Sequence, residues 1–394
     1  MRRNRFKPSA KSILFFAMFF FLISSTARAS TQPDAAFLQS IKSHRDAARR
    51  LIIKAVADKD PRVRVNAIEA CVYMKRDAAR KIVLNAIKDK HGAVRFVALV
   101  MMGDLRLKQG LPSAEKLLLQ ERANQRSWHR QLKPEQARLL QIRVRNQLRR
   151  KLKLSQTVEV GCLYALYLNG SKADISRLAM LLRSSDAGVR GNAVMVLGRM
   201  EDASAVPMIR QARLRKVDKA DSQRNAIVQL QAAEAVAKLL TVKAGQSERD
   251  IIRANAFSSA TPELRVMAVR AMGDLKDKAA ISVLKTMLAK EKNPQDPKAM
   301  PVLTELQLAA AESLAKMGVY DGLGVVIEAI GSAKRLPPPQ RVLWLSYVGR
   351  VLGEFKGNPQ ALKAVEALMK DAPLPVRIAA AMSILHLSEE ISDQ

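Results

Sequence analysis

Apolar residues recur with helical spacing through most of the chain. Val63, Ala67, Ala70, Cys71 and Met74 fall at i, i+4, i+7, i+8 and i+11, which places them on one face of a helix. Second amphipathic segments lie between such stretches, at residues 78–88, 175–182, 279–288 and 359–369. The spacing predicts pairs of helices joined by short turns, and neither helix of a pair can bury its apolar face alone.

These apolar positions belong to a repeating pattern. An apolar residue is followed by Arg, two variable positions, Ala, an apolar residue, one variable position, a small residue and an apolar residue, often with Gly next. The Arg-equivalent positions are 64, 95, 159, 190, 229, 265, 307, 341 and 377, with Gln at 229 and 307 and weaker copies at 159 and 341. Seven of the eight intervals run from 31 to 42 residues and one is 64. Such a period is typical of stacked repeat architectures.

Helix starts precede several copies. Asp60-Pro61 and Thr261-Pro262 each put a capping oxygen before a proline at the first helical position, and Asp186 serves a similar start. Aromatic residues make up only 4% of the chain, so few residues favour strands. We therefore expect an all-α fold, an α-solenoid of about nine helical hairpins, with a concave groove built by the second helix of each unit.

The pattern resembles the HEAT repeat. Val-Arg-x-x-Ala-apolar-x-small-apolar-Gly, continued by Asp-Leu in Gly103-Asp104-Leu105 and Gly273-Asp274-Leu275, is most similar to the phycobilisome-lyase-type HEAT-like repeat family. The resemblance covers residues 58–387 and implies a binding scaffold without implying any one chemistry.

The N-terminus has the organisation of an export signal. A basic stretch precedes the apolar run Ile13–Ile23, and Ala27 and Ala29 form a cleavage site before Ser30. The run is too short to cross about 30 Å of hydrocarbon, although an uncleaved anchor is the alternative. We expect a signal peptide at 1–29, a capping helix region at 30–57, the solenoid at 58–387 and a tail at 388–394, in a periplasmic or secreted protein.

The chain carries a formal net charge of +31, and part of that charge is concentrated in the 64-residue interval. Residues 121–154 hold eleven Lys or Arg against two acids, and after Pro134 the pattern predicts one helix. This basic insertion is either the solvated face of a long helix or a docking site for acidic polysaccharide or lipid head groups. Nucleic acid is disfavoured because export removes the protein from it. The candidate anion-binding residues are Arg138, Arg143, Arg145, Arg149, Arg150, Lys151 and Lys153.

The sequence offers no catalytic constellation. Its four histidines, His386 among them on an exposed part of the last helix, lack metal-ligand spacing, and no G-x-S-x-G motif occurs. Deoxyhypusine hydroxylase, which has similar repeats, binds metal through His-Glu pairs, and none occurs here. We expect no catalytic residue, cofactor or metal site, with an accessory or degenerate lyase or oxidoreductase-type protein as an alternative. Cys71 and Cys162 should be buried and unpaired.

The recurrent arginines occupy one structural position per unit: Arg64, Arg95, Arg190, Arg265 and Arg377. They could line one face as a basic ladder. Alternatively, each pairs with an acid such as Asp60, Asp89 or Asp186 and stiffens a turn. The second interpretation is favoured, because the motif occurs in scaffolds with unrelated partners. The function expected from the sequence is that of a monomeric, non-enzymatic, exported scaffold for a protein partner.

Overall fold

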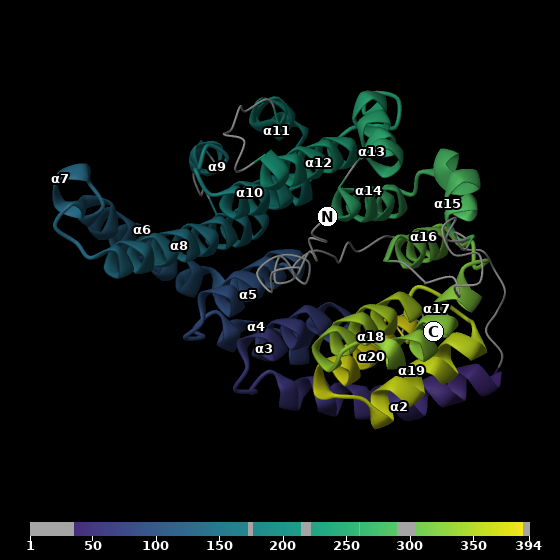
Figure 1. Cartoon of the computed structure of the whole chain (residues 1–394). Coiled ribbons are helices and arrows are strands. Elements are labelled where there is room, and N and C mark those ends of the chain that lie inside the picture. The colour runs from purple at the N-terminus through teal and green to yellow at the C-terminus, as the bar shows by residue number, and fades with distance from the viewer. Residues whose placement is uncertain (1–34, 172–175, 214–221, 260, 290–304, 389–394) are drawn as a thin grey trace, which may run out of the picture. The chain divides into compact units, whose positions relative to one another are not determined.

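Paired helices make up the fold, as a computed structural model shows for residues 35–171, 176–213, 222–259, 261–289 and 305–388 (Figure 1). These residues contain no strand. The first helices of the hairpins are α2 (Ala35–Ala55), α4 (Arg76–Ala86), α6 (Leu111–Gln131), α9 (Ser176–Leu181), α11 (Val206–Arg213), α13 (Gln246–Ser258), α15 (Ile281–Met287), α17 (Leu323–Ser332) and α19 (Pro359–Asp371). The expected signal segment, its cleavage site at Ala29 and Ser30, and the tail after 388 lie outside the described residues.

The second helices carry the repeat motif and follow one another in space. They are α3 (Pro61–Glu69), α5 (Gly92–Asp104), α8 (Ile142–Leu168), α10 (Ala187–Arg199), α12 (Ser222–Leu239), α14 (Pro262–Asp274), α16 (Glu305–Lys316), α18 (Pro338–Leu352) and α20 (Leu374–Leu387). Each contacts the next one in the series. The described chain therefore contains nine hairpins in an all-α solenoid, which confirms the expected fold class and the number of units.

Burial follows the predicted stripe. Val63, Ala67, Ala70, Cys71 and Met74 are all buried, and both cysteines are free thiols, as expected. Small residues in this stripe let neighbouring second helices approach closely. A Cβ at Gly273, in the motif's glycine position, would lie 2.6 Å from the Cα of Ser313. Glycine at this position is therefore a packing requirement between units.

The predicted helix starts are present, with one difference in detail. Asp60 caps α3 through the Arg62 amide, and Asp186 caps α10 through the amides of Gly188 and Val189. Thr261 precedes α14, but its side chain makes no capping hydrogen bond.

The long interval between copies has a simple structural origin. Helices α6 and α8 are the two helices of one hairpin, with 21 and 27 residues; α8 is longer than every other second helix, and α6 is matched among the first helices only by α2. A short helix, α7 (Pro134–Ala137), lies between them at the distal end of the hairpin (Figure 1). The expectation of one helix from Pro134 onward is wrong, because the chain leaves α7 at Ala137 and α8 begins only at Ile142.

The two ends of the described array are in contact. Helix α2 packs against α20 and α19, and α20 also contacts α3 (Figure 1). Ile41, Leu362 and Leu387 form a buried apolar cluster there. The Ser40 hydroxyl donates to Glu366 at 2.7 Å, and the rings of Tyr73 and His386 stack with centroids 4.6 Å apart. The sequence pattern did not predict this contact between the first and last hairpins.

Candidate functional site

The repeat arginines bind backbone carbonyl groups in the turn between the two helices of a unit or in the last turn of the first helix. Arg95 Nη1 donates to the carbonyl oxygens of Asp89 and Lys90 at 3.0 and 3.3 Å, and Arg190 Nη1 donates to those of Ser184 and Ser185 at 2.8 and 3.1 Å. Arg265 and Arg377 donate through Nε to the carbonyl oxygens of Ala256 and Met369, in the last turns of α13 and α19. Because carbonyl groups in the turn and in the last turn of the helix lack partners within that helix, a cation at this point satisfies them and joins the two helices of a unit.

Two of these arginines also pair with acids. Arg64 makes a bidentate contact with Asp89, with both N–O distances at 2.8 Å, and Arg95 Nη2 donates to Glu121 at 2.8 Å. Asp60 instead pairs with Arg62, and Asp186 pairs with Lys153 while capping its own helix. The five arginines therefore lie at turns between helices, and Arg64 and Arg190 are buried.

Replacing Arg64 with alanine should lower the free energy of unfolding by about 2–3 kcal/mol, because Asp89 and two carbonyl groups lose a buried donor. The matched control is Arg62→Ala, whose side chain is 72% exposed. That change should cost less than about 1 kcal/mol, as exposed ion pairs do. Guanidinium unfolding followed by circular dichroism measures both. Equal losses would mean that the turn does not depend on the buried arginine.

A second polar position recurs nine residues after each repeat Arg or Gln. It is occupied by Tyr73, Asp104, Arg199, Lys238, Asp274, Lys316, Arg350 and His386, with Leu168 as the exception. Nine residues correspond to two and a half helical turns, so this position lies on the opposite face of the helix from the repeat arginine. Asp104 of α5 and Arg199 of α10 pair at 3.1 Å, although 95 residues separate them.

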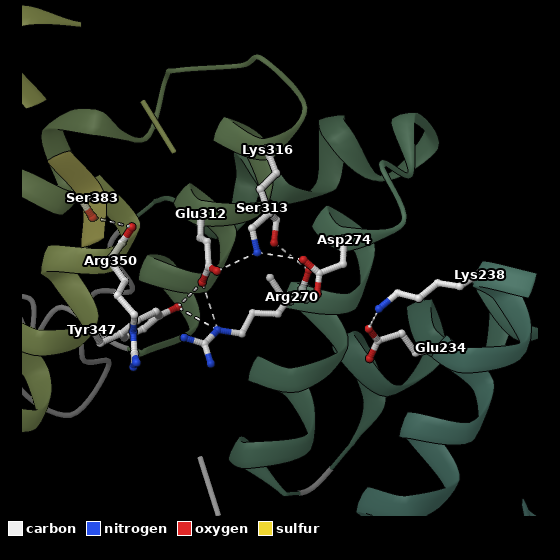
Figure 2. Close-up of polar contacts among 11 residues, drawn as sticks. Glu234, Lys238, Arg270, Asp274, Glu312, Ser313, Lys316, Tyr347, Arg350 and Ser383 are labelled. Carbon is white, nitrogen blue, oxygen red and sulfur yellow. Dashed lines mark hydrogen bonds and ion pairs between the residues drawn. The ribbon is translucent and has the colours of Figure 1, made fainter. Parts of the chain in front are cut away.

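In α12, α14 and α16 these positions and the residues four before them form an ionic ladder with Tyr347 of α18, defined here as Glu234, Lys238, Arg270, Asp274, Glu312, Lys316 and Tyr347 (Figure 2). Lys316 Nζ donates to Asp274 and Glu312, both at 2.8 Å. Arg270 Nε donates to Glu312 at 3.0 Å.

Tyr347 closes the centre of this network. Its hydroxyl donates to Glu312 at 2.9 Å, and the Arg270 guanidinium lies 4.1 Å from the centroid of its ring. The side chains of Glu312 and Arg270 are only 9% and 10% exposed. The ladder therefore joins three consecutive hairpins through charges that water reaches poorly.

Burial and neighbouring charges shift the pKa values of one acid in the ladder and of two acids outside it. Burial alone would raise the pKa of Glu312, but the charges of Lys316 and Arg270 outweigh it and lower that pKa to about 2. Burial raises the pKa of Glu354, just beyond α18, to about 7. Burial likewise raises the pKa of Glu69, the last residue of α3, to about 7, although Arg350 and Arg199 oppose it.

Glu69, Arg350 and Glu354 differ from the ladder in their contacts. Each is half-buried, and none makes a side-chain hydrogen bond or ion pair with the described residues. Figure 2 shows the backbone carbonyl of Arg350 accepting a hydrogen bond from the Ser383 hydroxyl. We call these three residues the unpaired triad. They come from α3, α18 and the turn after α18, and electrostatic attraction links Arg350 to Glu69.

The free energy of unfolding, measured at different pH values, should reveal the acids whose pKa is raised. A carboxyl group with a folded pKa near 7 and an unfolded pKa near 4.5 binds more protons when folded, so its contribution to stability is present below pH 4.5 and lost as pH rises to 7. We expect Glu354→Gln to remove about 1–2 kcal/mol of this decline. The exposed control Glu115→Gln should leave it unchanged. An identical decline in both variants would contradict the assignment.

The candidate anion-binding residues all lie on the long hairpin. Arg138, Arg143, Arg149, Arg150 and Lys151 are exposed. Lys153 is 44% exposed and pairs with Asp186 at 3.0 Å, while Arg145 is half-buried. Ala137, Leu140, Val144, Leu148 and Leu152 have the spacing of one apolar helical stripe, but only Ala137 and Leu148 are buried, and Val144 is 39% exposed. Val144 lies on the same face of α8 as Leu148, one turn nearer the distal end of the hairpin.

Two family models match parts of the chain. Residues 48–131 match HEAT repeats, and residues 264–290 match the PBS lyase HEAT-like repeat. The chain therefore contains HEAT repeats. The HEAT repeats make it a repeat scaffold of the kind that mediates protein interactions.

Comparisons with whole proteins add little to this. No curated protein matches the chain. Among solved structures, the crystal structure of an engineered protein from a structural genomics consortium is 13% identical, covers 89% of this chain and 91% of its own, and has a TM-score of 0.27. Such a score supports no argument about architecture or role.

One histidine of this HEAT-repeat protein does not lie where the sequence suggested. His386 was expected on an exposed part of the last helix, but it is half-buried against Tyr73, and burial lowers its pKa to about 3. The contact between the first and last hairpins accounts for this burial. Within the described ranges, no three His, Cys, Asp or Glu residues lie close enough to hold a metal ion, and no helix is long and apolar enough to cross a membrane.

The polar position nine residues after the repeat arginine is what the sequence analysis missed. Its signal was present, because eight of the nine HEAT units have a polar or aromatic residue at this point. The spacing of the apolar stripe and of the repeat arginine does not mark this position, because it lies on the opposite face of the helix from the arginine. The contacts between Asp104 and Arg199 and between Lys316 and Asp274 join different units, so they cannot be predicted without knowing how the units pack.

Proposed function

We propose that this HEAT-repeat protein is an exported, non-enzymatic scaffold that binds a protein partner through its second helices, at the unpaired triad. The observation that carries the proposal is that Glu69, Arg350 and Glu354 are half-buried ionisable groups that make no side-chain hydrogen bond or ion pair with the described residues, next to a ladder whose charges are paired. Partly desolvated charges without partners cost free energy, and a complementary surface would remove that cost.

The three residues together suggest the chemistry of the partner. Arg350 offers a planar donor group suited to a carboxylate, while Glu69 and Glu354 accept hydrogen bonds when ionised. A folded protein surface that presents an acidic side chain beside a donor would complement all three. The absence of a His-Glu pair from the sequence supports a non-enzymatic role.

Affinity capture from the exported fraction of the source cells tests this proposal. We expect a protein to be enriched by the native chain and lost with the double variant Glu69→Ala and Arg350→Ala. The matched control is Lys81→Ala with Glu115→Ala, which removes one charge of each sign from exposed positions elsewhere. No enrichment, or equal capture by both variants, would overturn the assignment of the triad.

Export is a separate part of the proposal. The basic stretch, the run Ile13–Ile23 and the site after Ala29 support it. Sequencing the N-terminus of the protein recovered outside the cytoplasm should give Ser30 as the first residue. Recovery of the intact N-terminus from the cytoplasm would contradict it.

A further inference from the structure

The long hairpin of α6 and α8 exposes an unusual surface at its distal end. Gln125 Nε2 donates to Ser155 at 3.2 Å and marks where the two helices join the array. From Arg126 to Lys151, beyond that contact, only Ala137 and Leu148 are buried. The distal hairpin is therefore covered by little besides its own two helices.

Three large apolar side chains close together in sequence are exposed at its tip. Leu139 is 87% exposed, Ile142 is 72% exposed and Val144 is 39% exposed. Single exposed apolar residues are normal on protein surfaces, but three within six residues at the end of a projecting hairpin form a patch.

Basic residues surround this patch. Lys133, Arg138 and Arg143 are exposed beside the tip, and Arg126, Arg130, Arg149, Arg150 and Lys151 are exposed along the two helices behind it. Glu135 is the only acidic residue between positions 122 and 153. An apolar tip with a basic collar is the arrangement expected of a segment that enters the interface of an anionic bilayer.

We propose that the tip of this hairpin, Leu139 and Ile142 with Val144, inserts among the head groups of an anionic lipid bilayer and holds the scaffold on the membrane surface. An acidic polysaccharide would satisfy the basic collar equally well but would leave Leu139 and Ile142 in water. The exposed apolar side chains therefore favour a bilayer over a soluble polyanion. This role goes beyond the binding of a protein partner and uses different residues, so either proposal can fail alone.

Vesicle binding by the mature chain tests insertion. Sedimentation with vesicles of phosphatidylcholine and phosphatidylglycerol should recover the protein, whereas phosphatidylcholine alone should not. The double variant Leu139→Asn and Ile142→Asn should weaken binding on the order of thirtyfold, from the apolar area withdrawn. The control Val242→Asn alters a residue that is 65% exposed outside the hairpin and should bind as the native chain does.

Charge reversal tests the collar. Arg143→Glu, Arg149→Glu and Arg150→Glu together should reduce vesicle binding on the order of a hundredfold or more. Lys81→Glu, Lys363→Glu and Lys370→Glu change the net charge equally at exposed positions elsewhere and should have a much smaller effect. Equal losses in the two triple variants would show general attraction by net charge and would overturn the assignment to the hairpin.

A fluorescent probe separates the bilayer from a soluble polyanion. The two native cysteines are buried, so an environment-sensitive dye can be attached at Leu139→Cys. Its emission should shift to shorter wavelength with anionic vesicles and stay unchanged with soluble dextran sulfate. An unchanged emission on vesicles, or native binding by the Leu139→Asn and Ile142→Asn variant, would overturn insertion and assign the collar to polyanions.

Discussion

Replacing Glu312 with alanine is expected to lower the free energy of unfolding by about 3–5 kcal/mol. Glu312 accepts hydrogen bonds from Arg270, Lys316 and Tyr347, and its side chain is 9% exposed. Its removal leaves a guanidinium and an ammonium group in a poorly hydrated site without their shared anion. Chemical unfolding followed by circular dichroism measures the loss.

An exposed ion pair provides the comparison. Lys285 and Asp321 pair at 2.7 Å, but their side chains are 47% and 52% exposed. Asp321→Ala should therefore cost less than about 1 kcal/mol. A similar small loss for Glu312→Ala would mean that water replaces the carboxylate readily and that the ladder does not stabilise the array.

Replacing Ile41 with aspartate should release the contact between the first and last hairpins. Ile41 is fully buried against Leu362 and Leu387. Placing a carboxylate in this apolar cluster forfeits the burial of a large side chain and leaves a charge without a partner, at a cost of about 4 kcal/mol or more. Hydrogen exchange should then accelerate in α2 and α20 more than in α12 and α14.

The same helix supplies a matched control for this change. Ile53 also lies in α2 but is 50% exposed. Ile53→Asp introduces the same charge into the same helix and should leave the exchange pattern close to that of the native chain. If both variants accelerate exchange equally, the effect comes from the propensity of α2 and not from its contact with α20.

The fold could be predicted from the sequence because the residues that determine each hairpin lie close together within that hairpin. The stripe from Val63 to Met74, the capping aspartates before α3 and α10 and the spacing of the repeat arginines all act within one unit. Their agreement over nine copies gave the architecture. The long hairpin was harder, because the apolar spacing of Leu140 and Val144 continued across a segment where the chain leaves the helix.

The candidate site could be predicted only in part. Arg64 lies a few residues after the start of its helix, as the other repeat arginines do, which predicts its place near a turn. Its partner Asp89 lies in the turn of the next unit, within reach of its side chain. The ladder and the unpaired triad depend on which helices become neighbours. Glu69 and Arg350 are 281 residues apart in sequence, and only the packing of α20 against α2 and α3 brings their helices into one region.

The packing of α2 against α20 limits how this protein can vary in length. An open array can gain or lose a unit at modest cost, because each repeat contacts only its neighbours. Here, inserting one hairpin would displace Ile41 from Leu387 and Tyr73 from His386. The number of repeats is therefore constrained by geometry, and we expect sequence drift to change loops such as the distal hairpin while the count of units stays constant.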